Sequence, residues 1–521
     1  MKKLLLLIVI SVMINLTSVL YAQQNTFSKV IKDVPGYGIQ AYSVVSGFDN
    51  SCIMVGDIHE MHGIIIKVDM DANVIWNKYF YTGNPTTYSS MHFKNVIATN
   101  DSCFLIIGQA YNVNNTNTEV LCIKINSDGD TLWSKAIGQN NYNLFPTSVQ
   151  QTNDSGYVII GSSSNQSSIF VAKIDVSGNL MWMNNYFVSS DNSEAYSIKQ
   201  TQDGAFFLSG HFANSSPWIY SAFLLKISQT GEYLWANKYN LSSSNFCSAK
   251  DMVITNDGFL FYLRLDEYFG VMKTDLLGNI VFNKSYDIYS WDAFEQTKFH
   301  KTSDSSYIFV SGGYFMDGTF TKIDIDGNII WTKGLVLMAS DVFETINKEF
   351  FIIGNGPLQG VKEKKIGEPQ IGIIKTDSLG NEEDCVFSIN AQPITDTIIA
   401  SPATFTSMSG GFVTSFHPIV NSTDLSVRSG CVDFLGDINE TTSEKEIEVF
   451  PNPSKGIFTF DIKNYREAQI IIYNTFGEIV LQSKINDQKP EIDLSSKAKG
   501  IYFYKLLFPD NKISTGKLII I

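Results

Sequence analysis

Residues 64–80 read IIIKVDMDANVIWNKYF, and closely similar stretches recur at six later places in the chain. These are 121–137 (LCIKINSDGDTLWSKAI), 170–186 (FVAKIDVSGNLMWMNNY), 223–239 (FLLKISQTGEYLWANKY), 270–286 (GVMKTDLLGNIVFNKSY), 319–335 (TFTKIDIDGNIIWTKGL) and 372–385 (GIIKTDSLGNEEDC). Each contains one lysine at the same place: Lys67, Lys124, Lys173, Lys226, Lys273, Lys322 and Lys375, at intervals of 57, 49, 53, 47, 49 and 53 residues. The chain therefore contains seven copies of one unit.

Two further positions recur within the unit. Five residues after the lysine stands a glycine in six units (Gly129, Gly178, Gly231, Gly278, Gly327 and Gly380), with Ala72 in the first. Nine residues after the lysine stands an aromatic residue in six units: Trp76, Trp133, Trp182, Trp235, Phe282 and Trp331. Glycine tolerates the positive φ of a tight hairpin, so two strands meet there. A large ring at one fixed place predicts packing between units.

A second hairpin precedes each of these stretches, as in 148–163 (SVQQTNDSGYVIIGSS), where alternating apolar residues flank an Asp-Ser turn. Four short strands in about 50 residues are typical of one blade of a β-propeller. The seventh unit lacks its last strand, and residues 27–31 (FSKVI) can supply it from the N-terminal end. We therefore predict an all-β chain: a seven-bladed β-propeller over 23–385, a connector over 386–440, and a small immunoglobulin-like β-sandwich over 446–521.

The shared Gly and Trp make residues 25 to 385 resemble the quinoprotein-like propeller repeats, in which such a pair docks neighbouring blades. Quinone-dependent dehydrogenases use this architecture. No cofactor-ring or metal-binding motif of theirs matches positions in this chain, so the resemblance implies a fold, and we predict no cofactor. The repeated lysines are expected to pair with nearby Asp residues or to extend past the blade to solvent.

The N-terminal segment predicts export. Lys2 and Lys3 precede an apolar run from Leu4 to Leu20 and then Ala22, which is the pattern of a signal peptide over residues 1–22. A transmembrane anchor is the weaker interpretation, because the run is short and contains Asn15. The formal net charge is −14, which argues against nucleic acid as a partner.

The C-terminal segment from Glu446 shows alternating strands separated by turns. Its elements Pro451-Asn452-Pro453 with Gly456, Tyr473-Asn474 with Gly477, Gly500-Ile501-Tyr502, and the terminal segment with Lys517 resemble the type A C-terminal sorting domain of proteins secreted by Bacteroidetes-type bacteria. This resemblance implies a sandwich recognised by the type IX secretion machinery, and a mature protein that is secreted or held on the outer cell surface without a transmembrane span.

Motifs for chemistry are few. His59 and His62 are three residues apart in a blade loop, whereas the zinc motif H-E-x-x-H needs a spacing of four on a helix, so we predict no metal. Asp69 and Asp324 begin stretches that look like calcium loops but lack the downstream Glu, which favours Asx turns. Cys385 and Cys431 flank the connector and are the preferred pair for a disulfide, although six cysteines allow fifteen pairings.

Loop lengths indicate where binding occurs. Both tight turns of each blade fall on one face of the propeller, and the long loops fall on the other, which we call the loop face. Trp218 and Trp291 lie in these loops and have no packing role in the repeat. Together they form, with neighbouring polar and aromatic side chains, the candidate ligand-binding set Trp218, Trp291, Tyr220, His211, His59 and His62.

The function predicted is that of an exported, non-catalytic binding or adhesion module, with a glycan or a surface protein as ligand. Two alternatives stay open: a secreted carbohydrate-active hydrolase or lyase with carboxylates at the axial mouth, and a structural surface component. No catalytic residue is assigned from the sequence.

Overall fold

The computed structural model describes most of the chain between residues 26 and 521. The described ranges are 26–33, 38–59, 61–81, 87–164, 167–188, 191–215, 218–242, 245–266, 268–288, 297–312, 318–356, 370–383, 385–389, 391–394, 397–415, 418–429, 447–462, 468–474, 479–487, 489–508 and 513–521. The predicted signal peptide lies outside them. The chain divides into two compact units, Met1–Phe434 and Leu435–Ile521.

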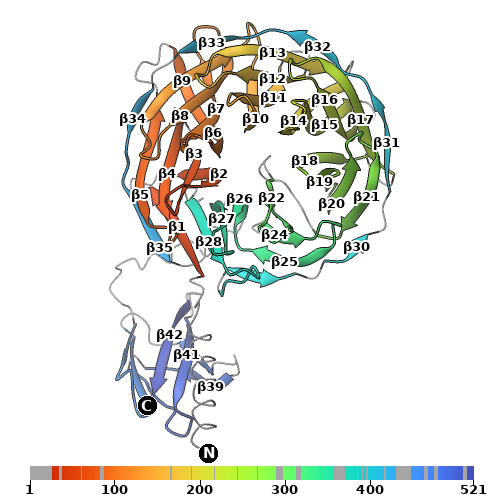
Figure 1. The fold of residues 1–521 in the computed structure, drawn as a ribbon. Helices are drawn as coiled ribbons and strands as arrows, with labels where there is room; N and C mark the ends of the chain where they lie inside the picture. Colours follow the sequence, from red (N-terminus) through yellow and green to blue (C-terminus); the bar gives the residue numbers. More distant parts are fainter. Residues whose placement is uncertain are drawn as a thin grey trace, which may run out of the picture. The chain divides into compact units, whose positions relative to one another are not determined.

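The first unit is a ring of seven β-sheets around a central axis (Figure 1). Within each sheet, consecutive strands pair antiparallel from the axis outward, as alternating apolar residues joined by tight turns dictate. The first three blades comprise β2 (Ile39–Ser46), β3 (Ser51–Ile58), β4 (His62–Asp69) and β5 (Val74–Tyr81); β6 (Tyr88–Ala98), β7 (Phe104–Asn112), β8 (Asn117–Ile125) and β9 (Thr131–Gly138); and β10 (Leu144–Gln151), β11 (Tyr157–Ser163), β12 (Ser168–Ile174) and β13 (Leu180–Phe187).

The remaining blades follow the same order. They comprise β14 (Asp191–Gln200), β15 (Phe206–Ser215), β16 (Trp218–Ile227) and β17 (Tyr233–Leu241); β18 (Cys247–Ile254), β19 (Gly258–Leu265), β20 (Tyr268–Asp275) and β21 (Ile280–Tyr286); β22 (Phe299–Lys301), β23 (Tyr307–Ser311), β24 (Gly318–Ile323) and β25 (Ile329–Leu335); and β26 (Met338–Glu344), β27 (Phe350–Gly356), β28 (Gln370–Thr376) and β1 (Phe27–Asp33). In the last of these, β1 pairs with β28 in the register Phe27 to Lys375. The N-terminal strand thereby completes the seventh blade and closes the ring.

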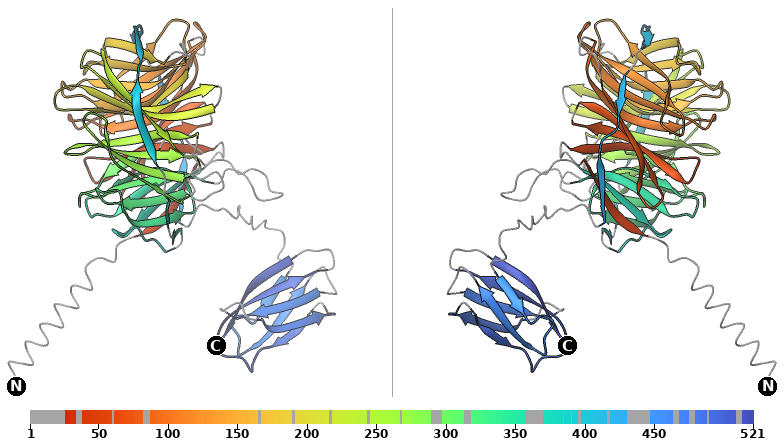
Figure 2. Two further views of the ribbon diagram at one scale, coloured as in Figure 1. Left: turned by 90° about the vertical axis from the view of Figure 1, so that its right-hand side faces the viewer. Right: turned by 90° about the vertical axis from the view of Figure 1, so that its left-hand side faces the viewer.

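A fifth strand lies on the outside of every blade. Residues 386–429, for which the sequence indicated a connector with some strand content, run once around the ring and pair antiparallel with each fourth strand in turn (Figures 1 and 2). These belt strands are β29 (Val386–Ser388), β30 (Pro393–Ile394), β31 (Ile398–Ala403), β32 (Thr406–Ser409), β33 (Phe412–Ser415), β34 (Ile419–Asn421) and β35 (Leu425–Ser429), and they add to β25, β21, β17, β13, β9, β5 and β1 respectively. The belt covers edges that would otherwise invite pairing with other chains.

Cys385 immediately precedes the belt and is disulfide-bonded. Cys52, Cys103, Cys122 and Cys247 form no disulfide. The predicted partner, Cys431, lies outside the described residues, two positions after the end of β35 at Ser429. Because β29 and β35 add to the sixth and seventh blades, which are neighbours, a Cys385–Cys431 bond would join the two ends of the belt.

Replacing Cys385 with Ser is therefore expected to destabilise the propeller. A loop of about 45 residues gives a disulfide contribution of up to about 4 kcal/mol. The measurement is the thermal unfolding midpoint of the oxidised wild type, the reduced wild type and Cys385→Ser, with Cys122→Ala as the control for loss of a free cysteine. An unchanged midpoint after reduction would contradict a stabilising disulfide between the two ends of the belt.

Neighbouring blades are joined where an aromatic side chain of one blade packs on a glycine of the next. A methyl group at Gly129 would lie 2.7 Å from the Trp76 ring, and one at Gly178 would lie 2.9 Å from Trp133. The same contact recurs around the propeller between Trp182 and Gly231, Trp235 and Gly278, Phe282 and Gly327, and Trp331 and Gly380. Each aromatic residue of the repeat thus packs on the hairpin of the following blade, where no larger residue fits.

Substitution of Gly231 tests this contact. Gly231 has φ +83°, and an added Cβ would lie 2.6 Å from Asn184 Nδ2 and 2.9 Å from the Trp182 ring. Gly231→Ala is expected to lower the free energy of unfolding by about 1–3 kcal/mol, because both the backbone and the ring must shift. Gly312→Ala is the control, since its nearest neighbour would be 3.5 Å away. Equal effects of the two changes in chemical denaturation would contradict the docking role.

The seven repeat lysines form ion pairs, which confirms the expectation that they pair with nearby acidic residues. In every blade the lysine of the third strand reaches a carboxylate in or beside the turn between the first two strands. The pairs are Lys67–Asp49 (2.6 Å), Lys124–Asp101 (2.9 Å), Lys173–Asp154 (3.0 Å), Lys226–Asp203 (3.8 Å), Lys273–Asp257 (2.8 Å), Lys322–Asp304 (2.7 Å) and Lys375–Glu349 (3.0 Å). The lysine stems are largely buried, so each ammonium depends on its partner.

These pairs predict loss of stability in acid. The hydrogen bond from Lys67 holds the pKa of Asp49 below its ordinary 3.8. At Asp101 burial raises the pKa, but hydrogen bonds from Thr99 and Lys124 outweigh it and the pKa is lowered. A carboxyl group whose folded-state pKa is depressed contributes stability above its unfolded pKa, and that contribution is lost as the pH falls through the folded value. The unfolding midpoint should therefore fall progressively below about pH 4.

Thermal unfolding across this pH range provides the measurement. Asp101→Asn should reduce the fall of the unfolding midpoint in acid, since the buried Lys124 ammonium then faces no carboxylate at any pH. Asp128→Asn, in an exposed hairpin turn, is the matched control. A midpoint that does not change between neutral pH and pH values below about 4 would count against the proposed role of the pairs.

The second unit contains two sheets. One is β36 (Ile447–Phe450), β37 (Ile457–Ile462) and β40 (Glu491–Asp493); the other is β38 (Ala468–Tyr473), β39 (Ile479–Ile485), β41 (Gly500–Leu507) and β42 (Ile513–Ile520). Apolar side chains of both sheets, among them Phe458, Ile470 and Leu518, share one core. Asn452 joins the entry segment to β42, donating to Lys517 O at 2.6 Å and accepting from Ile519 N at 2.9 Å.

Among the described residues there is no helix, and hence none long and apolar enough to cross a membrane.

Candidate functional site

The innermost strands of the propeller carry the most varied polar residues. Strands β2, β6, β10, β14, β18 and β26 each shift register against the second strand at the same point. Such a β-bulge re-aims the side chain beside it. The residues that follow the shift are Ser43, Asn95, Ser148, Ser197, Asp251 and Asp341, and Lys298 takes the corresponding place just before β22.

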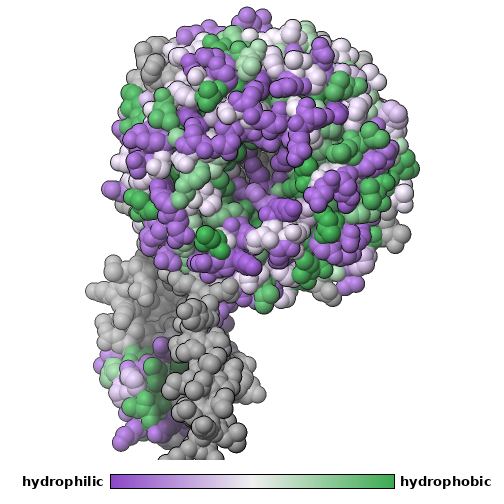
Figure 3. Space-filling view, in the orientation of Figure 1, coloured by the Kyte–Doolittle hydropathy of each residue, from purple (hydrophilic) through white to green (hydrophobic). Residues whose placement is uncertain are grey.

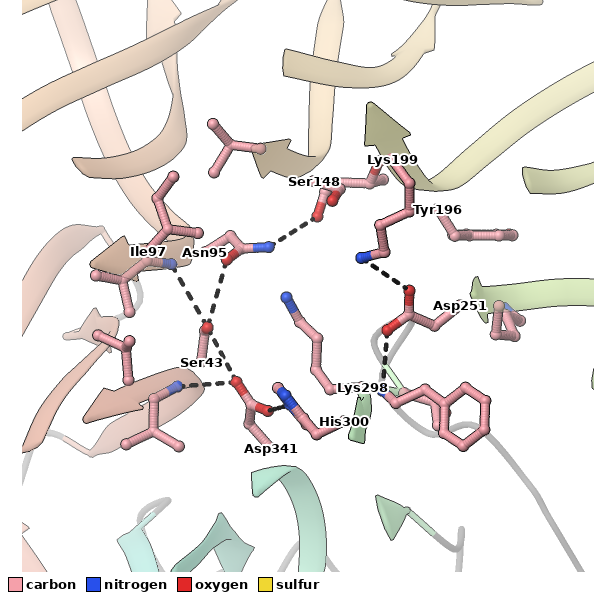
Figure 4. Close-up of a pocket in the computed structure, with 18 of the residues that line it drawn as sticks. Ser43, Asn95, Ile97, Ser148, Tyr196, Lys199, Asp251, Lys298, His300 and Asp341 are labelled. Atoms are coloured by element: carbon pink, nitrogen blue, oxygen red, sulfur yellow. Dashed lines mark hydrogen bonds and ion pairs between the residues drawn. The ribbon is translucent and has the colours of Figure 1, made fainter. Parts of the chain in front are cut away.

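These strands surround a cavity of about 350 Å³ on the propeller axis, to which all seven blades contribute lining residues. The space-filling view shows a hollow at the centre of the ring with hydrophilic side chains gathered around it (Figure 3). In close-up, polar side chains from opposite sides of the ring point toward one another across the hollow (Figure 4). We call this space the axial cavity. Its volume falls within the range of small-molecule sites.

The two carboxylates of the axial cavity are held by the protein itself. Asp341 Oδ2 accepts hydrogen bonds from Ser43 Oγ at 3.1 Å and from Val44 N at 3.0 Å, and His300 Nε2 lies 3.1 Å from Oδ1. Burial raises the pKa of Asp341, but His300 and the other donors outweigh it and the pKa is lowered. Asp341 is thus ionised, and its contacts join its own strand β26 to β2 and β22.

Asp251 has a similar arrangement. Its carboxylate accepts hydrogen bonds from Met252 N at 2.7 Å and from Phe299 N at 2.9 Å, so it links β18 to β22. Lys199 Nζ approaches Asp251 Oδ1 only to 3.9 Å (Figure 4). Both carboxylates therefore have structural partners that a hydrolytic acid or base would have to give up.

Three lysines face the same space. Lys250 is buried, with its Nζ 4.1 Å from the centre of the Tyr196 ring. Lys199 lies beside Asp251, as described. Lys298 points into the cavity, and its ammonium forms no hydrogen bond or ion pair with another of the described residues (Figure 4). Burial lowers the pKa of Lys298; Asp341 and Asp251 act in the opposite direction, and Lys199 adds to the lowering.

An aromatic cluster connects the axial cavity to the loop face. Trp218 is 60% exposed and stacks on Tyr220, with ring centres 6.5 Å apart and an interplanar angle of 17°. Tyr220 packs against His211 at 5.1 Å, and the Tyr196 hydroxyl lies 3.2 Å from His211 Nδ1. Since Tyr196 also lines the axial cavity, the series Trp218, Tyr220, His211 and Tyr196, which we call the Trp218 cluster, is continuous with it.

His211 is a buried, uncharged member of this cluster. Its Nδ1 lies 3.2 Å from Ser248 Oγ as well as from Tyr196. Burial lowers the pKa of His211 to about 3, and the nearby positive charges of Lys250 and Arg264 add to the effect. The imidazole is therefore neutral at every physiological pH.

The sequence-predicted residues separate into two groups. Trp218, Tyr220 and His211 come together in the Trp218 cluster. His59 and His62 lie in the first blade, outside the cavity lining: His59 Nε2 is 3.2 Å from Asp33 Oδ2, and His62 stacks on Tyr79 with ring centres 6.1 Å apart. Trp291 and Gly477 lie outside the described residues.

No group of three or more His, Cys, Asp or Glu side chains is arranged to hold a metal in the described ranges. Both apparent calcium loops are Asx turns. Asp69 Oδ1 accepts from Asp71 N and Asn73 N, and Asp324 Oδ1 accepts from Asp326 N and Asn328 N.

The cavity residues Lys199, Lys250, Asp251, Lys298, His300 and Asp341 were not predicted as a site. Asp251, Lys298 and Asp341 share the place that follows the register shift, but Lys199 and His300 lie two residues after that place and Lys250 lies one residue before it, so no single repeat position marks the set. The repeat alone gives no reason to prefer any of these positions, since half of any strand faces away from the sheet it packs on.

The C-terminal unit matches a known family. A family model described as secretion system C-terminal sorting domain matches residues 448–521. The second unit is that sorting domain. The protein is accordingly exported through the type IX secretion system to the cell surface or the extracellular space, as the resemblance of Pro451, Asn452, Pro453 and their companion residues implied.

Other similarities cover little of the relative or are low in identity. The ulvan lyase NLR42 of Nonlabens ulvanivorans is 31% identical over 75 residues, which is 14% of this chain and 14% of the lyase. Among solved structures, a putative 6-phosphogluconolactonase from Bacteroides uniformis gives a TM-score of 0.40 at 9% identity, covering 72% of this chain and all of the other. The polysaccharide lyase Uly1 gives a TM-score of 0.34 at 8% identity, covering 66% and 90% of the two chains. At these values the likenesses carry no argument about activity.

Proposed function

We propose that this sorting-domain protein is an extracellular binding module for a glycan, which it holds along the Trp218 cluster toward the axial cavity. The observation that carries the proposal is the exposed, stacked pair Trp218 and Tyr220, which leads through His211 and Tyr196 into a polar cavity. Aromatic faces pack on the apolar faces of sugar rings, and exposed aromatic residues beside a pocket concentrate binding energy.

The hydrogen bonds that the two cavity carboxylates accept favour binding over hydrolysis. A glycoside hydrolase needs two carboxyl groups free to exchange protons and to meet the substrate. Asp251 and Asp341 each accept hydrogen bonds from two backbone N–H groups, which fix both carboxylates in place. A structural surface component would need neither the cavity nor the aromatic path.

One specific observation favours a second candidate, a polysaccharide lyase. A lyase removes the proton beside a sugar carboxylate and breaks the neighbouring bond to the glycosidic oxygen, which leaves a carbon–carbon double bond. A base takes the first proton, an acid such as a hydroxyl gives one to the leaving oxygen, and a nearby cation stabilises the negative charge on the carboxylate. His211 is neutral, the Tyr196 hydroxyl lies 3.2 Å from it, and Lys250 lies over the Tyr196 ring. The named relative NLR42 is an ulvan lyase, but the matched stretch is too short to transfer that activity.

Glycan binding to residues 23–434 tests the proposal, with wild type compared against Trp218→Ala. Loss of the stacking surface should weaken binding at least tenfold, which corresponds to about 1.4 kcal/mol or more. Phe48→Ala is the matched control, because Phe48 is also an exposed ring, at 54%, but lies in a tight turn on the opposite face. Unfolding midpoints establish that both variants fold.

Two results would change the assignment. Binding that is equally strong in wild type and Trp218→Ala would contradict the Trp218 cluster as the contact surface. Release of unsaturated sugar products, detected by ultraviolet absorbance and abolished by Tyr196→Phe, would establish the lyase in place of the binding module.

A further inference from the structure

The axial cavity combines features that a neutral sugar does not require. It is lined by three lysines and one histidine, against two aspartates. Both aspartates accept hydrogen bonds from two backbone N–H groups, and Asp341 also contacts Ser43 and His300. The two aspartates therefore have more hydrogen-bond donors than the lysines of the cavity have carboxylate partners.

Lys298 is the clearest case. Its side chain extends into the cavity from the segment before β22, between Asp341 on one side and Asp251 on the other (Figure 4). In the described part of the chain, Asp251 pairs with Lys199 and Asp341 with His300, and neither carboxylate forms an ion pair with the Lys298 ammonium. A partly buried ammonium that has lost water and gained no direct partner is stabilised by an anion placed beside it.

We propose that the axial cavity binds the acidic substituent, a carboxylate or a sulfate ester, of the glycan whose sugar rings lie over Trp218, with Lys298 as its direct counter-ion. This deepens the proposed function and rests on it. The Trp218 cluster supplies the apolar contact for the rings, and the lysines give preference for charged over neutral glycans. Lys199 and Lys250 flank the anion from β14 and β18.

The acidity of the whole chain does not conflict with such a ligand. A net charge of −14 repels a polyanion at long range, so association is not electrostatically accelerated. Inside a cavity the nearest charges dominate, because partly buried groups are screened less than exposed ones. A single carboxylate can thus be bound by a protein that repels long anionic polymers.

The experiment uses the full mature chain and two matched pairs of probes. Short oligogalacturonates are compared with their fully methyl-esterified forms, which keep the sugar and lose the charge. Sulfated oligosaccharides are compared with their desulfated forms, and inorganic sulfate is tested alone. Isothermal titration calorimetry is run on wild type, Lys298→Gln and Lys298→Arg. Lys301→Gln is the control, because Lys301 is an exposed lysine of β22, three residues after Lys298, and is outside the cavity lining.

The expected result is that one acidic form binds at least tenfold more tightly than its neutral counterpart. Lys298→Gln should remove that preference, whereas Lys298→Arg and Lys301→Gln should retain it. The pair that shows the preference distinguishes carboxylate from sulfate.

A second readout needs no variant. Since the pKa of Lys298 is lowered in the free protein, binding of an anion at alkaline pH should be accompanied by proton uptake. Calorimetry in buffers of different ionisation enthalpy measures it. The other charged groups facing Lys298 are Lys199 of β14, Lys250 and Asp251 of β18, His300 of β22 and Asp341 of β26.

Failure of this proposal and failure of the proposed function give different results. If acidic and neutral forms bind equally and Lys298→Gln changes nothing, the anion site is wrong, while Trp218-dependent binding stands. If no glycan binds in a Trp218-dependent way, both are wrong.

Discussion

The contact between an aromatic ring of one blade and the hairpin glycine of the next is the interaction on which the propeller depends. It occurs six times, from Trp76 on Gly129 to Trp331 on Gly380, and it fixes both the spacing and the relative rotation of neighbouring sheets. Hydrogen bonds reinforce it where the chemistry allows: Tyr239 and Tyr286 donate to the carbonyl groups of Gly278 and Gly327. The same docking geometry is used at six of the seven steps between blades, and at the seventh Ala72 stands in place of the glycine.

Two segments of the chain close that ring of blades. The N-terminal strand β1 completes the seventh blade, and the belt of β29–β35 then adds one strand outside every blade. The belt runs opposite to the order of the blades and finishes next to β1, where β35 pairs with it. Its strands are short and mostly exposed, so their contribution is edge protection and linkage between blades rather than burial of a new core.

The same construction explains why a binding site can form at the axis. The outer and middle strands carry the residues that repeat, such as the lysine with its acidic partner and the docking ring, and these are fully used in holding the fold. The inner strands touch their counterparts only around the axis, so their polar positions are free to differ between blades. Ser43, Asp251, Lys298 and Asp341 stand at equivalent places but have different roles, and this difference produces an asymmetric cavity in a symmetric scaffold.

The sequence alone determined the repeat, the two hairpins in each unit, the docking positions and the export route, because each of these rests on local spacing: a glycine five residues and a ring nine residues after a lysine, or Pro451-Asn452-Pro453 near the chain end. It also singled out Trp218, Tyr220 and His211, which the repeat left unexplained; the sequence predicted them in loops, whereas the structure places them in β15 and β16. Only the tertiary structure revealed the belt, whose two- to six-residue strands have no periodicity to recognise and pair with partners up to hundreds of residues away. Only the tertiary structure brought Lys199, Lys250 and Lys298 together, because residues about 50 positions apart meet at the axis when the ring closes and not before.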